Sequence, residues 1–219
     1  MERALAHRGR DGSAVRSQGS VTMGLVRLAV TAPEEPVQVF SGAGGEIIAV
    51  ANAEIYNHRD LRRELRSRGR AVPSAVDSAI LPELYDAFGA DGFARLRGPF
   101  ALALYDRRKN TLLLARDRFG KKPLFWAQTP EGLYFASEAK ALLATGVLEL
   151  RPRASACARF LLRGRFEEDD YLLQGIHPVM PGQCCSFTSD RGAWAVGLHR
   201  FAPDAPSEGA PPDADALAG

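Results

Sequence analysis

Cysteine and histidine are scarce in this 219-residue sequence, which contains three cysteines and four histidines. The cysteines are Cys157, Cys184 and Cys185, an odd number that includes an adjacent pair, which makes a poor disulfide framework for a secreted protein. We therefore expect a reducing, cytoplasmic environment. The sequence has no C-x-x-C spacing, and its histidines are scattered, so we expect no metal site.

Excess charge of one sign and long apolar runs are also lacking. Lys plus Arg number 28 against 26 for Asp plus Glu, which gives no reason to expect a nucleic-acid partner. The arginines between residues 59 and 70 alternate with acids and leucines, a pattern typical of the solvated face of a helix. No apolar run is long enough to cross a membrane, and the first twelve residues contain no leader-like apolar stretch.

Apolar residues make up 46% of the chain and charged residues 25%, a balance typical of a globular domain with a packed core. We assign that domain to residues 1–201. Residues 202–219 are rich in Pro, Ala, Gly and acid, with one leucine as the only large apolar residue, and are predicted to be a tail or linker.

Antiparallel strands dominate the predicted structure. Residues 45–52 form a short, partly β-branched apolar run after a glycine-rich turn, which predicts a buried strand. Residues 99–116 and 120–137 each contain two apolar runs joined by a short polar turn, and each predicts a hairpin. The segment 176–187 predicts strand, turn and strand around a Pro-Gly pair.

Helices are predicted between the strands. Residues 58–68 place leucines four apart among charges, and residues 78–88 carry apolar residues on one face before a glycine. Asp77 is the expected N-cap of the second helix, and Ser137 precedes a further short helix. Helices and hairpins in blocks indicate the α+β class.

Six segments occur in an order that resembles the glutaminase domain of asparagine synthetase, a class II glutamine amidotransferase with the N-terminal-nucleophile hydrolase fold. They are HRGRDG at 7–12, RLAV at 27–30, NAEIYNH at 52–58, RDRFGKKPLFW at 116–126, FASEAKALL at 135–143 and IHPVMPG at 176–182. The resemblance implies a four-layer sandwich, with two antiparallel sheets between layers of helices.

The resemblance also implies a glutamine site. Arg27 would clamp the α-carboxylate of glutamine, and Val30 would be a further contact. Asn52 and the backbone N–H of Ala53 would form the oxyanion hole, although the family has glycine where Ala53 stands. The added Cβ restricts φ there and could crowd a ligand that approaches the backbone.

Glu54 and Asp77 match the acids of the family motif, and Asp77 would help to hold the α-ammonium group of the substrate. Asp77 and Arg27 each have an ordinary structural explanation as well. Capping of the helix that follows is by itself enough to explain Asp77. In the same way, Arg27 is explained by an exposed arginine on a strand. From the residues alone, both explanations stay open.

The family uses an N-terminal cysteine as nucleophile, and no residue of this sequence corresponds to that cysteine. We expect the family's first strand to be missing and glutamine hydrolysis by residues 1–219 to be near background. Two hypotheses remain: a glutaminase domain whose start lies elsewhere in the gene, or a non-catalytic domain that binds an amino acid or a partner protein.

The resemblance implies that glutamine is the ligand and that a separate synthetase domain or subunit is the partner. ATP and Mg²⁺ would belong to that synthetase domain, so we expect no cofactor in this chain. The ammonia acceptor is not predicted.

Overall fold

The strands of the protein pair antiparallel throughout the described part of the chain. The structure is a computed structural model that describes residues 1–28, 34–164, 171–190 and 193–201. The predicted tail at 202–219 therefore lies outside the described residues, as does Val30. No parallel β-α-β unit is present among the described residues, as the α+β prediction requires.

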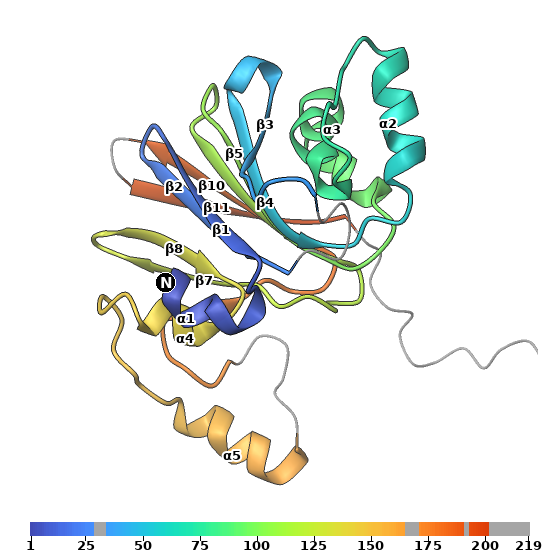
Figure 1. Ribbon diagram of the computed structural model, residues 1–219. Coiled ribbons are helices and arrows are strands. Elements are labelled where there is room, and N and C mark those ends of the chain that lie inside the picture. The colour runs from blue at the N-terminus through green and yellow to red at the C-terminus, as the bar shows by residue number, and fades with distance from the viewer. Residues whose placement is uncertain (29–33, 165–170, 191–192, 202–219) are drawn as a thin grey trace, which may run out of the picture.

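A six-stranded sheet occupies the centre of the molecule, in the order β11-β10-β6-β5-β4-β3 (Figure 1). Its strands are β3 (Phe40–Gly42), β4 (Ile47–Ala53), β5 (Phe100–Asp106), β6 (Thr111–Arg116), β10 (Gln183–Asp190) and β11 (Ala193–Arg200). The predicted strand at 45–52 and the predicted hairpin at 99–116 are thus confirmed as β4 and the β5–β6 pair. Strands β4, β5 and β6 are rich in buried apolar residues because layers cover both faces of the sheet.

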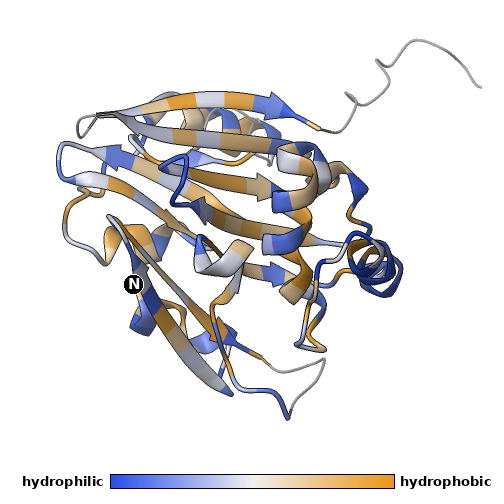
Figure 2. Ribbon diagram, turned by 90° about the horizontal axis from the view of Figure 1, so that it is seen from above, coloured by the Kyte–Doolittle hydropathy of each residue, from blue (hydrophilic) through white to orange (hydrophobic). Residues whose placement is uncertain are grey.

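Two helices cover one face of this sheet, α2 (His58–Ser67) and α3 (Leu81–Phe88). The two buried leucines of α2, Leu61 and Leu65, pack into a core that also contains Ala49, Leu102 and Leu104. The other side of α2 is charged, which makes the helix almost uniformly blue in Figure 2. The amphipathic pattern at 58–68 therefore identified both the helix and its buried face.

The opposite face of the six-stranded sheet packs against a second β-layer that consists of two separate sheets. One is the hairpin β1 (Gly12–Gln18) and β2 (Val21–Arg27), and the other has the order β8-β7-β9. The bounds of the latter strands are Phe125–Thr129 for β7, Gly132–Ala136 for β8 and His177–Pro178 for β9. Val50, Ala103 and Met23 belong to the core between the layers.

A fourth layer of short helices covers the β7–β8 hairpin from outside. It includes α1 (Glu2–Leu5) and α4 (Ala139–Leu143), whereas α5 (Ala154–Arg163) extends away from the rest of the molecule (Figure 1). A third core, which includes Ala127, Ala141 and Leu142, fills the space between hairpin and helices. Three cores between four layers confirm the predicted sandwich, with the difference that the second β-layer is in two parts.

The predicted caps of two helices are wrong. The helix expected from Ser78 begins at Leu81 and follows a 3₁₀ turn, Asp77–Ile80, and it has no side-chain cap. The carboxylate of Asp77 instead accepts a hydrogen bond from the backbone N–H of Ile55, across the site described below. The residue before α4 is Glu138, not Ser137, and it provides no side-chain cap either.

No helix in the described ranges is both long enough and apolar enough to cross a membrane.

A buried aspartate holds the turn that leads from β6 to β7. Asp117 is 2% exposed, and its carboxylate accepts hydrogen bonds from the backbone N–H groups of Phe100, Phe119, Lys121 and Lys122, at 3.0 to 3.3 Å. The carboxylate therefore satisfies donors that the tight turn leaves without a strand partner.

The neighbouring Arg116 holds the same turn from its carbonyl side. Its guanidinium donates to the carbonyls of Gly120 and Lys122 at 2.6 and 2.7 Å, and to that of Val179 at 3.0 Å. Burial lowers the pKa of Arg116, so the guanidinium is desolvated and its hydrogen bonds replace lost water contacts.

Replacement of Asp117 by Asn should strongly destabilise the domain. One carboxylate oxygen becomes a donor and faces backbone N–H groups, which leaves them unsatisfied at a cost of about 3 kcal/mol in the free energy of unfolding. The measurement is the urea midpoint by circular dichroism. Asp60→Asn is the control, because Asp60 is exposed, pairs with Arg63, which is also exposed, and should shift stability by less than ~0.5 kcal/mol. Equal midpoints for the two variants would contradict the role assigned to Asp117.

Candidate functional site

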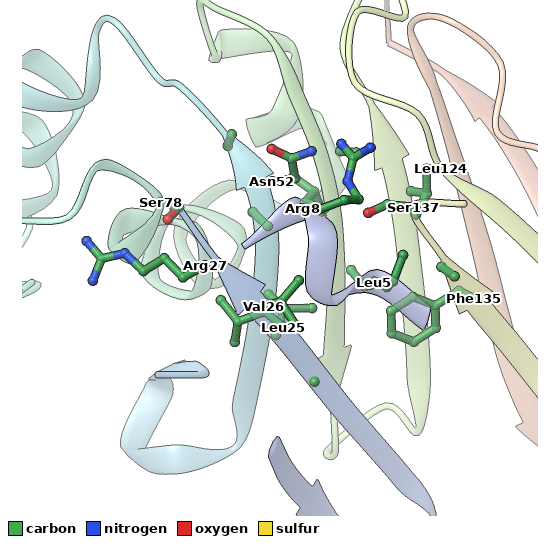
Figure 3. Close-up of a pocket in the computed structure, with 18 of the residues that line it drawn as sticks. Leu5, Arg8, Leu25, Val26, Arg27, Asn52, Ser78, Leu124, Phe135 and Ser137 are labelled. Carbon is green, nitrogen blue, oxygen red and sulfur yellow. The ribbon is translucent and has the colours of Figure 1, made fainter. Parts of the chain in front are cut away.

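A cavity of about 570 Å³ lies between the second β-layer and the central sheet. Its walls come from β2, the end of β4, the 3₁₀ turn before α3, and β8 with the residues that follow it (Figure 3). Leu25, Val26, Leu124 and Phe135 make one part of it apolar, whereas Asn52 lies toward a polar end. Ligand sites of this size typically combine an apolar wall with a few placed polar groups.

The end of β4 directs two hydrogen-bond donors toward the cavity. The side chain of Asn52 lies on the same face of the strand as Ile48 and Val50, because alternate residues of a strand share a face. In the β4–β5 ladder, the N–H of Glu54 donates to the carbonyl of Pro99 at 2.9 Å. The N–H of the preceding residue, Ala53, therefore points away from β5, and Ala53 lines the cavity.

The methyl group of Ala53 does not face the cavity. It packs with the core between the central sheet and the helices, on the opposite face of β4 from Asn52. Ala53 also has an ordinary φ, since the described non-glycine residues with positive φ are Ala43 and Asn110. In this structure the backbone of Ala53 thus has no conformation that would require glycine.

Arg27 ends β2 at the rim of the cavity. Its Nη1 donates to the carbonyl of Glu35 at 2.7 Å, and the side chain extends toward the side of the site where Ser78 lies (Figure 3). The backbone of Arg27 is crossed closely by Gly9, at which an added Cβ would lie 2.5 Å from Arg27 backbone atoms. Glycine in the HRGRDG segment is therefore needed to bring the start of the chain against β2.

Asp77 lines the same cavity and is 5% exposed. Its two carboxylate oxygens accept from the N–H of Ile55 at 2.6 Å and from the N–H of Ser78 at 2.7 Å. The residue therefore fixes the backbone just after β4, and its remaining lone pairs can accept from a ligand. Its structural role is this bond to Ile55 and not the helix cap expected from the sequence.

Glu54 also lines the cavity, and its Oε1 lies 3.0 Å from Nζ of Lys122. Lys122 belongs to the turn held by Arg116 and Asp117, so the ion pair joins that turn to the end of β4. The sequence prediction included Glu54 but missed Lys122. Lys122 belongs to the RDRFGKKPLFW segment, one of the six that carry the family resemblance. Nothing in that segment indicates that its second lysine contacts residue 54.

Arg8 is a second cavity residue that the sequence prediction missed. Its Nη1 donates to Glu138 at 2.8 Å, and His7 and Lys140 contact the same carboxylate. Burial acts to raise the pKa of Glu138, but the hydrogen bonds from Arg8, Lys140 and His7 outweigh it and lower the pKa to about 2. Glu138 therefore stays anionic at neutral pH and ties the start of the chain to α4.

None of the three cysteines lines the cavity. Cys184 and Cys185 are buried in β10, facing the cores on opposite sides of the central sheet, and burial raises the pKa of each thiol to about 12. Cys157 lies on α5. His177 stacks on the Trp126 ring at 4.5 Å and belongs to β9. The thiols of β10 are thus kept in the protonated, unreactive form at neutral pH.

The described residues bring together the predicted site residues Arg27, Asn52, Ala53, Glu54 and Asp77 around one cavity. In the same ranges, no three His, Cys, Asp or Glu side chains are grouped so that they could hold a metal ion. The arrangement offers donors, a guanidinium and two carboxylates, which suits a small zwitterion that carries an additional polar group.

Gly98 lets the backbone pass close to Glu54. Its φ is +125°, and an added Cβ would lie 2.0 Å from the Glu54 carbonyl oxygen. Gly98→Ala should therefore displace residues 54–56 and destabilise the domain by about 2 kcal/mol or more. Gly146→Ala is the matched control, because Gly146 has φ +78° but open space around it, and strain alone should cost about 1 kcal/mol. Urea unfolding of both variants measures the difference, and a Gly98 variant no less stable than the Gly146 variant would rule out the close approach.

Comparison with known proteins gives one family for most of the chain. Residues 1–197 match the family model described as a glutamine amidotransferase domain. Asparagine synthetase [glutamine-hydrolyzing] 3 of Bacillus subtilis is 33% identical over 193 residues, which cover 87% of this chain and 31% of that protein. Amidase chyE of Penicillium rubens is 33% identical over 180 residues, 81% of this chain and 26% of that protein.

The fold has counterparts among solved structures. The glutamine phosphoribosylpyrophosphate amidotransferase of B. subtilis, solved with ADP and GMP, matches with a TM-score of 0.64 at 18% identity, over 91% of this chain and 45% of that one. A second structure, titled as the allosteric regulatory enzyme of purine biosynthesis, matches with a TM-score of 0.58 at 20% identity. The present chain thus spans about a third of the length of the first curated relative and under half of these solved chains.

Proposed function

This chain belongs to the glutamine amidotransferase domain family and is similar to the glutaminase half of asparagine synthetase, and we propose that its cavity is the glutamine site. The observation that carries the proposal is that Arg27, Asn52, Ala53, Glu54 and Asp77 all line one cavity.

The proposed roles follow from the charges of free glutamine. The guanidinium of Arg27 would exchange its bond to the Glu35 carbonyl for two parallel hydrogen bonds to the α-carboxylate. Asp77 and Glu54 supply anionic acceptors for the α-ammonium group. The side-chain amide of Asn52 and the N–H of Ala53 would donate to the amide oxygen, which gains negative charge if a nucleophile attacks the amide carbon.

The larger reaction would need groups beyond these residues. We propose that a synthetase domain or subunit receives the ammonia that such a glutaminase site releases, as the name of the B. subtilis relative suggests. ATP and Mg²⁺ would belong to that synthetase, and the glutamine site itself would use no cofactor. The synthetase, and not the glutamine site, would determine which molecule accepts the ammonia.

Arg27→Ala should weaken glutamine binding about tenfold to a hundredfold, because a charge-assisted pair of hydrogen bonds contributes ~1.5 to 3 kcal/mol. Isothermal titration calorimetry measures the change, with Arg63→Ala as the control, since Arg63 lies exposed on α2 and pairs with Asp60. Circular dichroism must first show that both variants are folded. Equal affinity in the parent and in Arg27→Ala would contradict the proposed carboxylate clamp.

Residues 1–219 alone should release no ammonia from glutamine above a buffer control. Cys184 and Cys185 are buried with pKa values near 12, and Cys157 lies on α5 and not at the cavity. A coupled glutamate dehydrogenase assay detects the ammonia. Turnover that disappears in Cys157→Ser would reveal an unforeseen nucleophile, and turnover that survives serine at all three positions would contradict the requirement for a cysteine.

A further inference from the structure

The ion pair between Glu54 and Lys122 joins two cavity residues that are 68 positions apart in the sequence. Nζ of Lys122 lies 3.0 Å from Oε1 of Glu54, and the two side chains are 23% and 49% exposed. Pairs this open to solvent contribute little to folding, because water screens the charges. The contribution of this ion pair to the stability of the fold therefore does not explain why the backbone around both residues is held so closely.

Lys122 is fixed at both of its backbone polar groups. Its N–H donates to the carboxylate of Asp117 at 3.1 Å, and its carbonyl accepts from Nε of Arg116 at 2.7 Å. Asp117 is buried, and Arg116 is tied to two further carbonyls, so the turn itself has little freedom. The ammonium group of Lys122 is thus presented to the cavity from a rigid support.

The backbone of Glu54 is held just as closely. Its N–H donates to Pro99, its carbonyl is approached by Gly98, and the next N–H, that of Ile55, donates to Asp77. What remains adjustable at Glu54 is the side chain, whose carboxylate contacts Lys122. The position of that carboxylate at the cavity wall is therefore set by Lys122.

We propose that Lys122 is a positioning residue of the glutamine site: it holds the Glu54 carboxylate where that carboxylate accepts hydrogen bonds from the α-ammonium of the ligand. This inference rests on the proposed function. Residues 52 and 54 share a face of the chain and lie about 6.7 Å apart. That spacing is comparable to the length of an extended glutamine between its amide and its amino group, so Asn52 and Glu54 can serve the two ends of one ligand.

Glutamine titrations on the folded parent chain and five variants, one of them a double variant, test the proposal. Lys122→Met should lower the affinity about fivefold to tenfold, since the charged hydrogen bond of Glu54 to the ligand loses its geometry. Lys122→Arg keeps the cation and should recover most of that loss. Lys121→Met is the matched control, because Lys121 belongs to the same turn but does not line the glutamine cavity, and it should leave the affinity unchanged.

The other two variants, Glu54→Gln and the double variant Glu54→Gln/Lys122→Met, complete a double-mutant cycle with Lys122→Met. If Lys122 acts through Glu54, the substitution of Lys122 has no further effect on glutamine affinity once Glu54 is glutamine. Urea midpoints of all these variants should stay close to that of the parent, as expected for a solvent-screened pair, which separates positioning from folding.

The outcomes distinguish this inference from the proposed function. A parent that binds glutamine, an Arg27→Ala variant that binds weakly and a Lys122→Met variant that binds like the parent would overturn the role of Lys122 and leave the site in place. Additive losses in the Glu54 and Lys122 variants would also overturn it, since Lys122 would then act independently. A folded parent that binds no glutamine would refute both proposals together.

Discussion

The buried carboxylate of Asp117 is the contact on which the geometry of the site depends. Four backbone N–H groups converge on it, one from the start of β5 and three from the turn after β6. Because a single anion satisfies donors from both segments, the end of the central sheet and the turn toward β7 cannot move independently. Lys122, at the end of this turn, is therefore carried to a defined place beside Glu54.

The alternation of side chains in β4 explains why one strand can serve both core and site. Ile47 and Ala49 face the helices, whereas Ile48 and Val50 face the second β-layer. Where the strand leaves the region covered by β3, the same alternation turns Asn52 toward the cavity. The hydrophobic pattern that builds the sandwich thus also sets the direction in which the polar residues after it point.

Local pattern predicted the strongly apolar elements and missed the weakly patterned ones. The strand at 45–52 and the hairpin at 99–116 were found because strands buried on both faces appear as continuous apolar runs. The helix at 58–68 was found because its buried face places leucines four apart. The β1–β2 hairpin was not predicted, since β1 is largely exposed and carries almost no apolar alternation. Helix α5 was missed for a similar reason, because among its residues Ala156 alone is fully buried.

The site residues could be predicted only in part. Arg27, Asn52, Ala53, Glu54 and Asp77 came from resemblance to a family, and the structure places all five at one cavity. The direction of the Ala53 methyl group depends on which residues of β4 face which core, and local sequence does not contain this information. The hydrogen bond between Asp77 and Ile55 joins residues 22 positions apart, so it could not be predicted from local sequence either. Lys122 was missed because its pairing with Glu54 exists only in the folded chain.

Three residues of the recognised segments have structural roles that bear on how such domains are found in genomes. Gly9 allows a backbone crossing, and Arg116 and Asp117 brace a turn. We expect substitution at any of these three positions to disturb the fold before it disturbs a ligand, so the requirement for a folded domain constrains them by itself. A search that recognises these residues therefore detects an architecture. Evidence for chemistry has to come from the smaller set of side chains around the cavity.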